Sequence, residues 1–147
     1  FDAVYQERTA VAMTGSEKNG ILKKCMHYYH ILLGHTYTLN KHDFGKCYMR
    51  LVNEDALKKY IYPTLIAGYD RSPRSGRKAE IFYNFTPDIW RKHIKNVFSY
   101  VKYKDPEHRV VILKSWNEWG ESNYVEPDLR YGTALIDALK EEIQGFE

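Results

Sequence analysis

Apolar positions in the first half of the chain predict one clear helix, a second helical stretch and two strands. Residues 1–6 form a short apolar run typical of a buried strand. The first helix is predicted from residues that recur at the spacing of one helix face and can end at a glycine: Leu22, Cys25, Met26, Tyr29, Leu33 and then Gly34. Residues 48–60 also show helical spacing, with Asn53 as an alternative start. Residues 62–67, entered through Pro63, are predicted as a short buried strand.

The second half of the chain repeats the order strand, loop, helix. Residues 80–83 and 109–115 are short runs predicted as strands. Between them, Thr86 is predicted to cap a helix that has Pro87 at its first position. The apolar stripe of that helix is Trp90, Ile94, Val97, Phe98 and Val101. A second stripe predicts the last helix: Tyr131, Ala134, Leu135, Ala138 and Leu139.

Apolar strands that alternate with helices are typical of βα units, in which helices cover a parallel sheet. The expected fold class is therefore α/β. In such sheets the chemistry lies where strands end and loops begin, at the C-terminal edge. Two polar loops have this position, residues 69–78 and residues 116–128. A chain of 147 residues with 44% hydrophobic content fits one domain, residues 1–147.

Composition narrows the classes of function. The 22 Lys and Arg against 19 Asp and Glu give a net charge of +3, which is too mild to indicate nucleic-acid binding. Cys25 and Cys47 lack the spacing of a disulfide scaffold or a zinc site and are compatible with a reducing compartment, so we expect a cytoplasmic location. No apolar run approaches the roughly 20 residues of a membrane span. The aromatic content of 15% favours sugar binding, which uses flat aromatic faces.

Glu118 and Glu121 are the candidate catalytic acids. They follow the predicted strand 109–115 and lie three residues apart around Gly120, which allows a sharp turn of the backbone. Cleavage of a glycosidic bond needs an acid that protonates the leaving oxygen and a carboxylate that acts as base, nucleophile or ion stabiliser. Repulsion between neighbouring carboxylates favours retention of a proton on one of them. The alternative is that both are solvated loop charges.

The residues around this acid pair are candidates for substrate binding. Trp116 and Trp119 can stack on sugar rings, although the alternative is that they pack the rim of the sheet. Other side chains can bond sugar hydroxyls: Asn117, Tyr124 and Glu126. Asp128 is predicted to cap the final helix rather than to take part in catalysis.

The loop at residues 69–78 supplies a second set of candidates. Asp70 can bind substrate hydroxyls, and Arg74 can clamp a phosphate or a sugar carboxylate; the alternative is an Asp–Arg pair that stiffens an exposed loop. The histidines at 27, 30 and 35 lack ligand spacing and are expected to be structural, so no metal and no cofactor is predicted. Asn84 begins a glycosylation sequon, but Thr86 is better explained as the helix cap.

The motif at residues 115–121, followed by residues 124–128, strongly resembles the WbsX-like glycosyltransferase family, also described as glycoside hydrolase family 99-like. The resemblance covers nearly the whole chain: residues 1–4 look like a mid-barrel strand, residues 62–74 look like a strand and its Trp-Asp-x-x-Pro-Arg loop, and Tyr131 opens the last helix as in that family. Tyr69 departs from the pattern because Trp is usual there, and Ser122 stands where a small residue or Gly is frequent.

The resemblance implies a (β/α)8 TIM barrel and a role in bacterial surface polysaccharide or lipopolysaccharide synthesis. It also implies that Glu118 acts as the base toward a sugar hydroxyl and Glu121 as the general acid/base, as in the related endo-acting α-mannosidases. A full barrel needs about 250 residues. The chain is therefore expected to be the C-terminal part, about half, of a barrel that is truncated at its N-terminus.

Three functions follow as hypotheses. The first is a carbohydrate-active enzyme of the WbsX-like type that transfers a glycosyl group, with a glycan substrate and a sugar nucleotide or a lipid-linked acceptor as further partners. The second is an endo-acting glycoside hydrolase. The third is a sugar-binding fragment without catalysis, because open sheet edges impair folding or promote dimerisation.

Overall fold

The computed structural model describes residues 3–14, 20–33 and 40–146. Its helices and strands are, in chain order, β1 Val4–Gln6, α1 Thr9–Thr14, α2 Gly20–Leu32, β2 Lys41–Asp43, α3 Phe44–Cys47, β3 Ile61–Leu65, α4 Ser72–Ser75, β4 Ile81–Tyr83, α5 Pro87–Val101, β5 Ile112–Leu113, β6 Asn117–Glu118, β7 Asn123–Tyr124 and α6 Ala134–Gln144. Short 3-10 turns occur at Tyr48–Arg50, Glu54–Leu57, Gly76–Lys78, Pro106–His108 and Trp119–Glu121.

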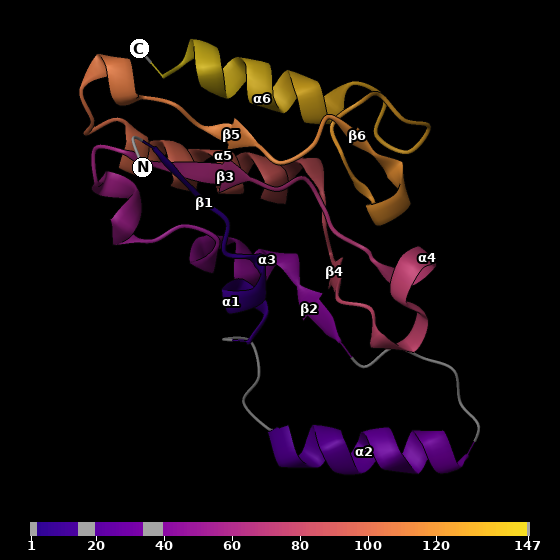
Figure 1. Ribbon diagram of the computed structural model, residues 1–147. Helices are drawn as coiled ribbons and strands as arrows, with labels where there is room; N and C mark the ends of the chain where they lie inside the picture. Colours follow the sequence, from indigo (N-terminus) through magenta and orange to yellow (C-terminus); the bar gives the residue numbers. More distant parts are fainter. Residues whose placement is uncertain (1–2, 15–19, 34–39, 147) are drawn as a thin grey trace.

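The centre of the fold is a parallel sheet in the order β1-β3-β5 (Figure 1). β2 and β4 pair in parallel as a second sheet, and β6 and β7 form an antiparallel hairpin. The predicted α/β class with parallel strands is therefore confirmed. The strands of the described ranges form these separate sheets and do not close into a barrel. The expected half of a (β/α)8 barrel is not confirmed and stays a prediction.

Helix α5 begins at its predicted cap. Thr86 Oγ1 accepts a 3.3 Å hydrogen bond from the peptide nitrogen of Ile89, and Pro87 occupies the first helical position. The cap satisfies a donor that has no partner inside the helix. Proline needs no such partner because it has no N–H group. Local chemistry therefore sets where this helix starts.

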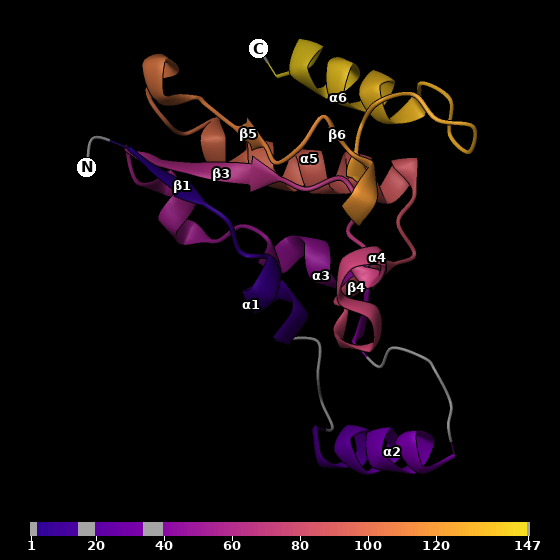
Figure 2. The same cartoon turned by 45° about the vertical axis from the view of Figure 1, so that its right-hand side comes forward.

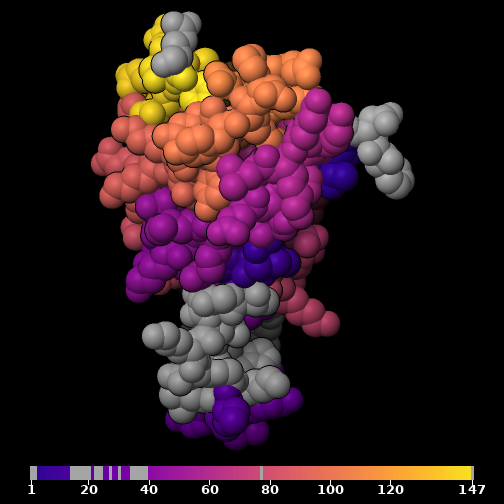
Figure 3. Space-filling view, turned by 90° about the vertical axis from the view of Figure 1, so that its left-hand side faces the viewer, coloured from indigo at the N-terminus to yellow at the C-terminus, as the bar shows by residue number. Residues whose placement is uncertain are grey.

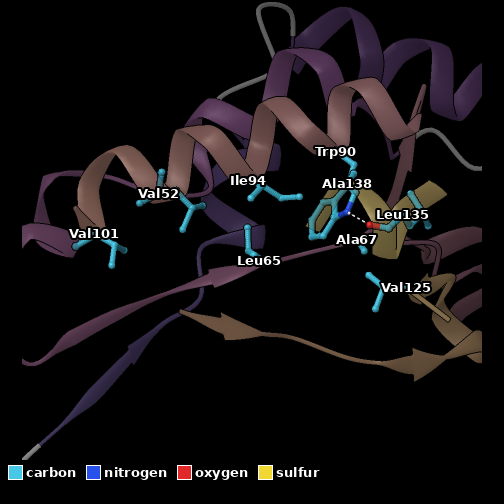
Figure 4. Packing of buried hydrophobic residues seen from close by; sticks show 11 residues of the cluster. Val52, Leu65, Ala67, Trp90, Ile94, Val101, Val125, Leu135 and Ala138 are labelled. Carbon is cyan, nitrogen blue, oxygen red and sulfur yellow. Dashed lines mark hydrogen bonds between the residues drawn. The ribbon is translucent and has the colours of Figure 1, made fainter. Parts of the chain in front are cut away.

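Helices α5 and α6 pack together, and α5 also packs on β3, to form the main core (Figure 4). The buried residues of this cluster are Val52, Ala56, Leu65, Ala67, Trp90, Ile94, Val97, Val101, Val125, Leu135 and Ala138. Trp90 is fully buried, and its indole Nε1 donates a 3.1 Å hydrogen bond to the carbonyl oxygen of Leu135. This bond satisfies the polar atom of the ring and joins the two helices.

The register of the central sheet shows which side chains lie on the face opposite the main core. Leu65 and Leu113 are aligned and both pack against the main core. Because successive side chains of a strand point to opposite faces, Lys114 and Thr64 face away from that core. β1 is aligned so that Gln6 lies opposite Pro63, which places Glu7 on the same face as Thr64. This face carries charged side chains at its C-terminal edge.

A second buried cluster joins α1 and α3 to the two parallel sheets: Ala12, Met13, Phe44, Cys47, Leu51, Ile66 and Phe82. His93 of α5 lies against it, with its ring 5.8 Å from that of Phe44 in an edge contact. The ring nitrogen Nε2 of His93 accepts a hydrogen bond from the peptide nitrogen of Ile66. Complete burial lowers the pKa of His93 to about 3, so the ring is neutral.

Helix α2 confirms the predicted amphipathic helix but lies apart from the rest of the chain (Figures 1 and 2). In the space-filling view, α2 and α6 occupy opposite ends of the molecule (Figure 3). The described residues of the predicted stripe include Met26 at 49%, Tyr29 at 58% and, directly after α2, Leu33 at 50% exposed. The periodicity therefore predicts the helix correctly, although these three side chains are not buried.

Three expectations about the elements need correction. The strand expected to be buried at residues 1–6 is half exposed where it is described, with Val4 at 49%, because β1 is an edge strand. Residues 48–60 do not form one helix: Asn53 is extended (φ −144°, ψ −177°) and begins a separate 3-10 turn, as the alternative start anticipates. The strand predicted at residues 109–115 is reduced to Ile112–Leu113.

Candidate active site

The two candidate acids lie on one tight hairpin after the C-terminal end of β5. β6 pairs with β7, and the 3-10 turn Trp119–Glu121 joins them. Ser122 closes the turn in the left-handed conformation, with φ 49°. At the entrance, the hydroxyl of Ser115 accepts a 2.9 Å hydrogen bond from the peptide nitrogen of Glu118. We call residues 115–124 the acid hairpin.

Arg74 of α4 contacts both acids. Its Nη1 lies 3.1 Å from Oε1 of Glu121, and its Nη2 lies 3.3 Å from Oε1 of Glu118. The side chain of Glu121 is 14% exposed and that of Glu118 is 39% exposed, so one acid is sheltered and the other faces solvent. Helix α4 and the acid hairpin lie side by side in both ribbon views (Figures 1 and 2). One guanidinium thus holds two carboxylates together.

The loop after β3 is tied to the acid hairpin through Asp70 and Arg71. The peptide nitrogen of Asp70 donates a 2.6 Å hydrogen bond to the carbonyl oxygen of Glu121, and Arg71 Nε lies 3.4 Å from Oε1 of the same residue. The carboxylate of Asp70 accepts a 2.7 Å bond from the peptide nitrogen of Ser72. Arg71 and Arg74 therefore pair with the glutamates of the hairpin, and Asp70 orders the backbone that carries them.

The aromatic and polar neighbours of the acids form a second group on the hairpin. Trp119 stacks on Tyr124 with ring centroids 3.8 Å apart and an angle of 18° between the rings. The indole Nε1 of Trp119 donates a 2.8 Å hydrogen bond to Oε2 of Glu126. Trp116 and Asn117 are exposed beside them. Trp119 thus has one face against Tyr124, and about half of its surface stays open.

Asp128 does not cap the final helix, so that expectation is wrong. Helix α6 begins after Thr133, and Asp128 instead accepts hydrogen bonds from the peptide nitrogens of Arg130 and Tyr131 and from the hydroxyl of Tyr124. Burial alone would raise the pKa of Asp128, but these hydrogen bonds and the nearby charge of Arg130 lower it. Burial and the bond to Asp128 raise the pKa of Tyr124 to about 12.

Sequence reasoning missed an ion pair at the same edge of the sheet. Nζ of Lys114 lies 3.4 Å from Oε1 of Glu7 and 5.0 Å from the centroid of the Tyr69 ring. Burial raises the pKa of the Tyr69 hydroxyl; Arg71 opposes the rise, whereas the charges of Glu121 and Glu7 add to it. Contacts therefore run from Glu7 through Lys114 and Tyr69 toward the acid hairpin. A charged residue directly after each of two strands is the signal in the sequence that could have found this pair.

The described residues contain no group of three His, Cys, Asp or Glu side chains placed to hold a metal ion. The side chains of His27 and His30, and the whole of His35, lie outside what the structure describes. Their structural role therefore stays a prediction.

None of the helices in the described ranges has the length and apolar character to cross a membrane.

Comparison with known proteins identifies the family. A model of the family described as glycosyltransferase WbsX matches residues 1–139. Two curated relatives, both called uncharacterized protein WxcX and both from strains of Xanthomonas campestris pv. campestris, are 31% identical to the chain over 96 residues. The match covers 64% of this chain but only 14% of each relative's length. No solved structure matches the chain significantly. The resemblance expected from the motifs is confirmed, and the chain belongs to the glycosyltransferase WbsX family.

Proposed function

We propose that this chain supplies the catalytic acids of a carbohydrate-active enzyme that transfers glycosyl groups, with Glu118 and Glu121 as the acid and base pair. The observation that carries the proposal is the bridge from Arg74 to both carboxylates. Because the donors of one guanidinium have a fixed planar arrangement, the two carboxylates that Arg74 contacts lie close to each other. Acid pairs that act on glycosidic bonds span about 5 to 9.5 Å.

The difference in exposure between the two acids supports different roles. Glycosyl transfer to a hydroxyl needs a base that removes the hydroxyl proton and an acid that protonates the leaving oxygen. Glu118 is the more exposed carboxylate and is suited to receive the proton of an incoming sugar hydroxyl. Glu121 is the sheltered carboxylate, which two arginines hold in place, and the resemblance to the related α-mannosidases supports its assignment as the general acid/base. Arg74 and Arg71 supply positive charge that balances the pair.

The surrounding side chains are proposed to bind the glycan. Trp116 and the open side of Trp119 offer stacking faces for sugar rings. Asn117 and Glu126 offer polar atoms for hydroxyl groups, as do Tyr124 and Asp70. Arg74 is proposed to change partners when substrate arrives, since a phosphate or a sugar carboxylate can compete for its guanidinium.

The type of domain, the biosynthetic role and the partners of the reaction are part of the same proposal. We infer that residues 1–147 form a single partial (β/α) barrel domain, because the parallel sheet carries Glu7 and Lys114 at the C-terminal edge of one face. The reaction is proposed to serve bacterial surface polysaccharide or lipopolysaccharide synthesis in the cytoplasm. Its donor would be a sugar nucleotide and its acceptor a glycan or a lipid-linked sugar. The family to which the chain belongs supports this setting.

The first test replaces each acid by its amide in the full-length protein. Glu118→Gln and Glu121→Gln keep size and shape but remove the charge and the proton-transfer capacity, so each should lower turnover by at least about a hundredfold. Glu54→Gln changes an exposed glutamate remote from the hairpin and should leave turnover unchanged. Wild-type activity in both acid variants, with circular dichroism showing intact folding, would overturn the assignment.

A second test separates transfer from hydrolysis. The full-length protein is incubated with α-mannans and, separately, with sugar nucleotides plus acceptor glycans. An extended acceptor supports the transferase, whereas free oligosaccharide supports the alternative of an endo-acting hydrolase related to the α-mannosidases. Glycan binding without turnover in either assay supports the remaining alternative of a sugar-binding protein.

A further inference from the structure

A cavity of about 380 Å³ lies between the C-terminal ends of β3 and β4 and the segment that follows the acid hairpin. Glu118 and Glu121 do not line it. Six aromatic residues from four segments line its walls: Tyr69, Phe82, Tyr83, Phe85, Tyr124 and Tyr131. A small cavity lined by several aromatic rings and a few polar groups is the usual form of a small-molecule site.

The cavity is next to the acid hairpin and shares its backbone. Ser122, which directly follows Glu121, lines the cavity. Asp70 also lines it and bonds the carbonyl oxygen of Glu121 through its peptide nitrogen. The ring of Tyr124 forms part of the wall and stacks on Trp119 of the hairpin. A ligand in this cavity would therefore lie against the hairpin backbone, and Arg74 does not line the cavity.

The backbone around the cavity adopts rare conformations. In the described residues, the non-glycine positions with positive φ are Asn84 (59°) and Ser122 (49°), and both line this cavity. Gly68, with φ 79°, lines it as well. Non-glycine residues with positive φ cost free energy and gather at ligand sites, where the surrounding structure enforces them. Two non-glycine residues in this conformation, together with Gly68, therefore surround one cavity, which favours a shape held for a ligand.

The charges of the lining select the class of ligand. Asp70 and Asp128 bring two carboxylates, whereas the cation is Arg130, whose guanidinium lies 4.8 Å from the centroid of the Tyr131 ring. A phosphate would approach both carboxylates and is disfavoured. Hydroxyl groups can donate to carboxylate and amide oxygens, and the apolar face of a sugar ring can stack on tyrosine. The volume is at the lower end for small-molecule sites, which suits one or two sugar units.

We propose that this cavity is a second sugar-binding subsite, which takes an uncharged sugar unit of the glycan next to the acid hairpin. The identification of the ligand as part of a glycan rests on the proposed function. The subsite would hold a neighbouring unit of the chain whose bond is made or broken at Glu118 and Glu121. The enzyme would thereby favour glycans long enough to fill this subsite as well as the position at the acids.

Tyr83 and Asn84 are the residues to change, because both are exposed at the cavity and lie outside the buried core. Tyr83→Ala removes a stacking face, and Tyr103→Ala is the matched control since Tyr103 is exposed elsewhere. Asn84→Gly removes the side-chain amide but keeps the positive φ accessible. Asn84→Gly also removes the 3.3 Å hydrogen bond that the Asn84 amide donates to Asp43, so its folding is checked by circular dichroism.

Binding is measured by calorimetry on the full-length protein with the Glu118→Gln change, so that turnover does not interfere. The probes are mannose, glucose, mannobiose and mannose 6-phosphate. We expect the uncharged sugars to bind, Tyr83→Ala and Asn84→Gly to weaken their binding by about tenfold or more, and Tyr103→Ala to leave it unchanged.

Unchanged affinity in both cavity variants, preference for the sugar phosphate, or no binding of any uncharged probe would each overturn the subsite. This design distinguishes failure of the subsite from failure of the acid and base assignment. If Tyr83→Ala weakens binding but the wild-type protein shows no glycosyl turnover, the subsite stands and the acid and base assignment is rejected. Turnover that depends on Glu118, with binding insensitive to Tyr83, would do the reverse.

Discussion

A β-carbon added at Gly68 would lie 2.6 Å from the carbonyl oxygen of Ser122. The loop after β3 and the acid hairpin therefore approach each other more closely than any side chain on residue 68 would allow. This contact, together with the bond from Asp70 to Glu121, fixes the position of the hairpin relative to the central sheet. The geometry of the acids depends on a residue that carries no functional group.

Gly68→Ala is expected to displace the acid hairpin. Alanine at φ 79° costs about 1 to 2 kcal/mol from the backbone conformation alone. The close contact with Ser122 adds about 1 to 3 kcal/mol. Gly76→Ala is the matched control, because Gly76 also has a positive φ but a β-carbon there meets nothing within 4 Å.

Denaturant unfolding and turnover assays of the intact protein compare the two variants. Gly68→Ala should be the less stable of the two and should lose most activity, whereas Gly76→Ala should lose some stability only. Equal losses of stability in both variants would show that the close approach to Ser122 does not matter.

Arg74 is expected to matter for activity more than for stability. Its side chain is 56% exposed, and exposed ion pairs contribute about 1 kcal/mol or less. Arg74→Lys cannot hold two carboxylates in a planar arrangement, so turnover should fall by about tenfold or more while unfolding changes little. Lys58→Ala, which breaks the exposed ion pair with Asp55, serves as the control and should leave turnover unchanged. Normal turnover in Arg74→Lys would mean that the bridge has no part in the reaction.

Local sequence signals predicted the elements whose ends depend on local chemistry. Helix α5 starts where Thr86 and Pro87 place it, because the cap bond spans only three residues. Helix α6 starts later than a cap at Asp128 would place it. The carboxylate of Asp128 instead accepts a hydrogen bond from the peptide nitrogen of Arg130, in a turn that the pattern of apolar residues does not reveal. The strand predicted at residues 109–115 is too long, because apolar residues occur beyond the paired backbone of Ile112–Leu113.

The residue types of the candidate site can be read from the sequence, whereas the contacts between distant residues cannot. The motif around Glu118 and Glu121 indicates two acids on one loop, but their bridge to Arg74 joins positions 44 and 47 residues apart. The pair of Glu7 and Lys114 joins positions 107 residues apart. Such contacts follow from the strand order β1-β3-β5, which periodicity alone does not specify.

The pair of Glu7 and Lys114 is expected to be coupled. Their side chains are 27% and 24% exposed, so removal of either partner leaves a partly buried charge without its opposite charge, although Thr9 still donates to Glu7 and Lys114 still lies over the ring of Tyr69. Each single change to alanine should destabilise the protein by about 1 to 2 kcal/mol, and the double change by less than the sum of the two. A double-mutant cycle measured by denaturant unfolding gives the coupling. Strict additivity would show that the ion pair contributes nothing to stability.

His93 is expected to make the stability of the protein depend on pH. The ring is fully buried, accepts the N–H group of Ile66, and has a pKa lowered by burial to about 3, whereas the unfolded chain has the ordinary value of about 6.5. Below pH 6.5 the unfolded state therefore binds a proton that the folded state does not. Stability is fully present above the unfolded value and falls as the pH decreases toward 3, by up to about 1.4 kcal/mol for each pH unit.

His93→Gln isolates this contribution, because a side-chain amide oxygen can still accept the bond from Ile66 but does not titrate. Denaturant unfolding of both proteins from pH 7 to pH 4 should give a difference in stability that shrinks or reverses as the pH falls. His108→Gln is the control, since His108 lies on the surface turn after α5 and is only partly buried. Parallel curves for the wild type and His93→Gln would mean that the buried ring does not cause the loss of stability in acid.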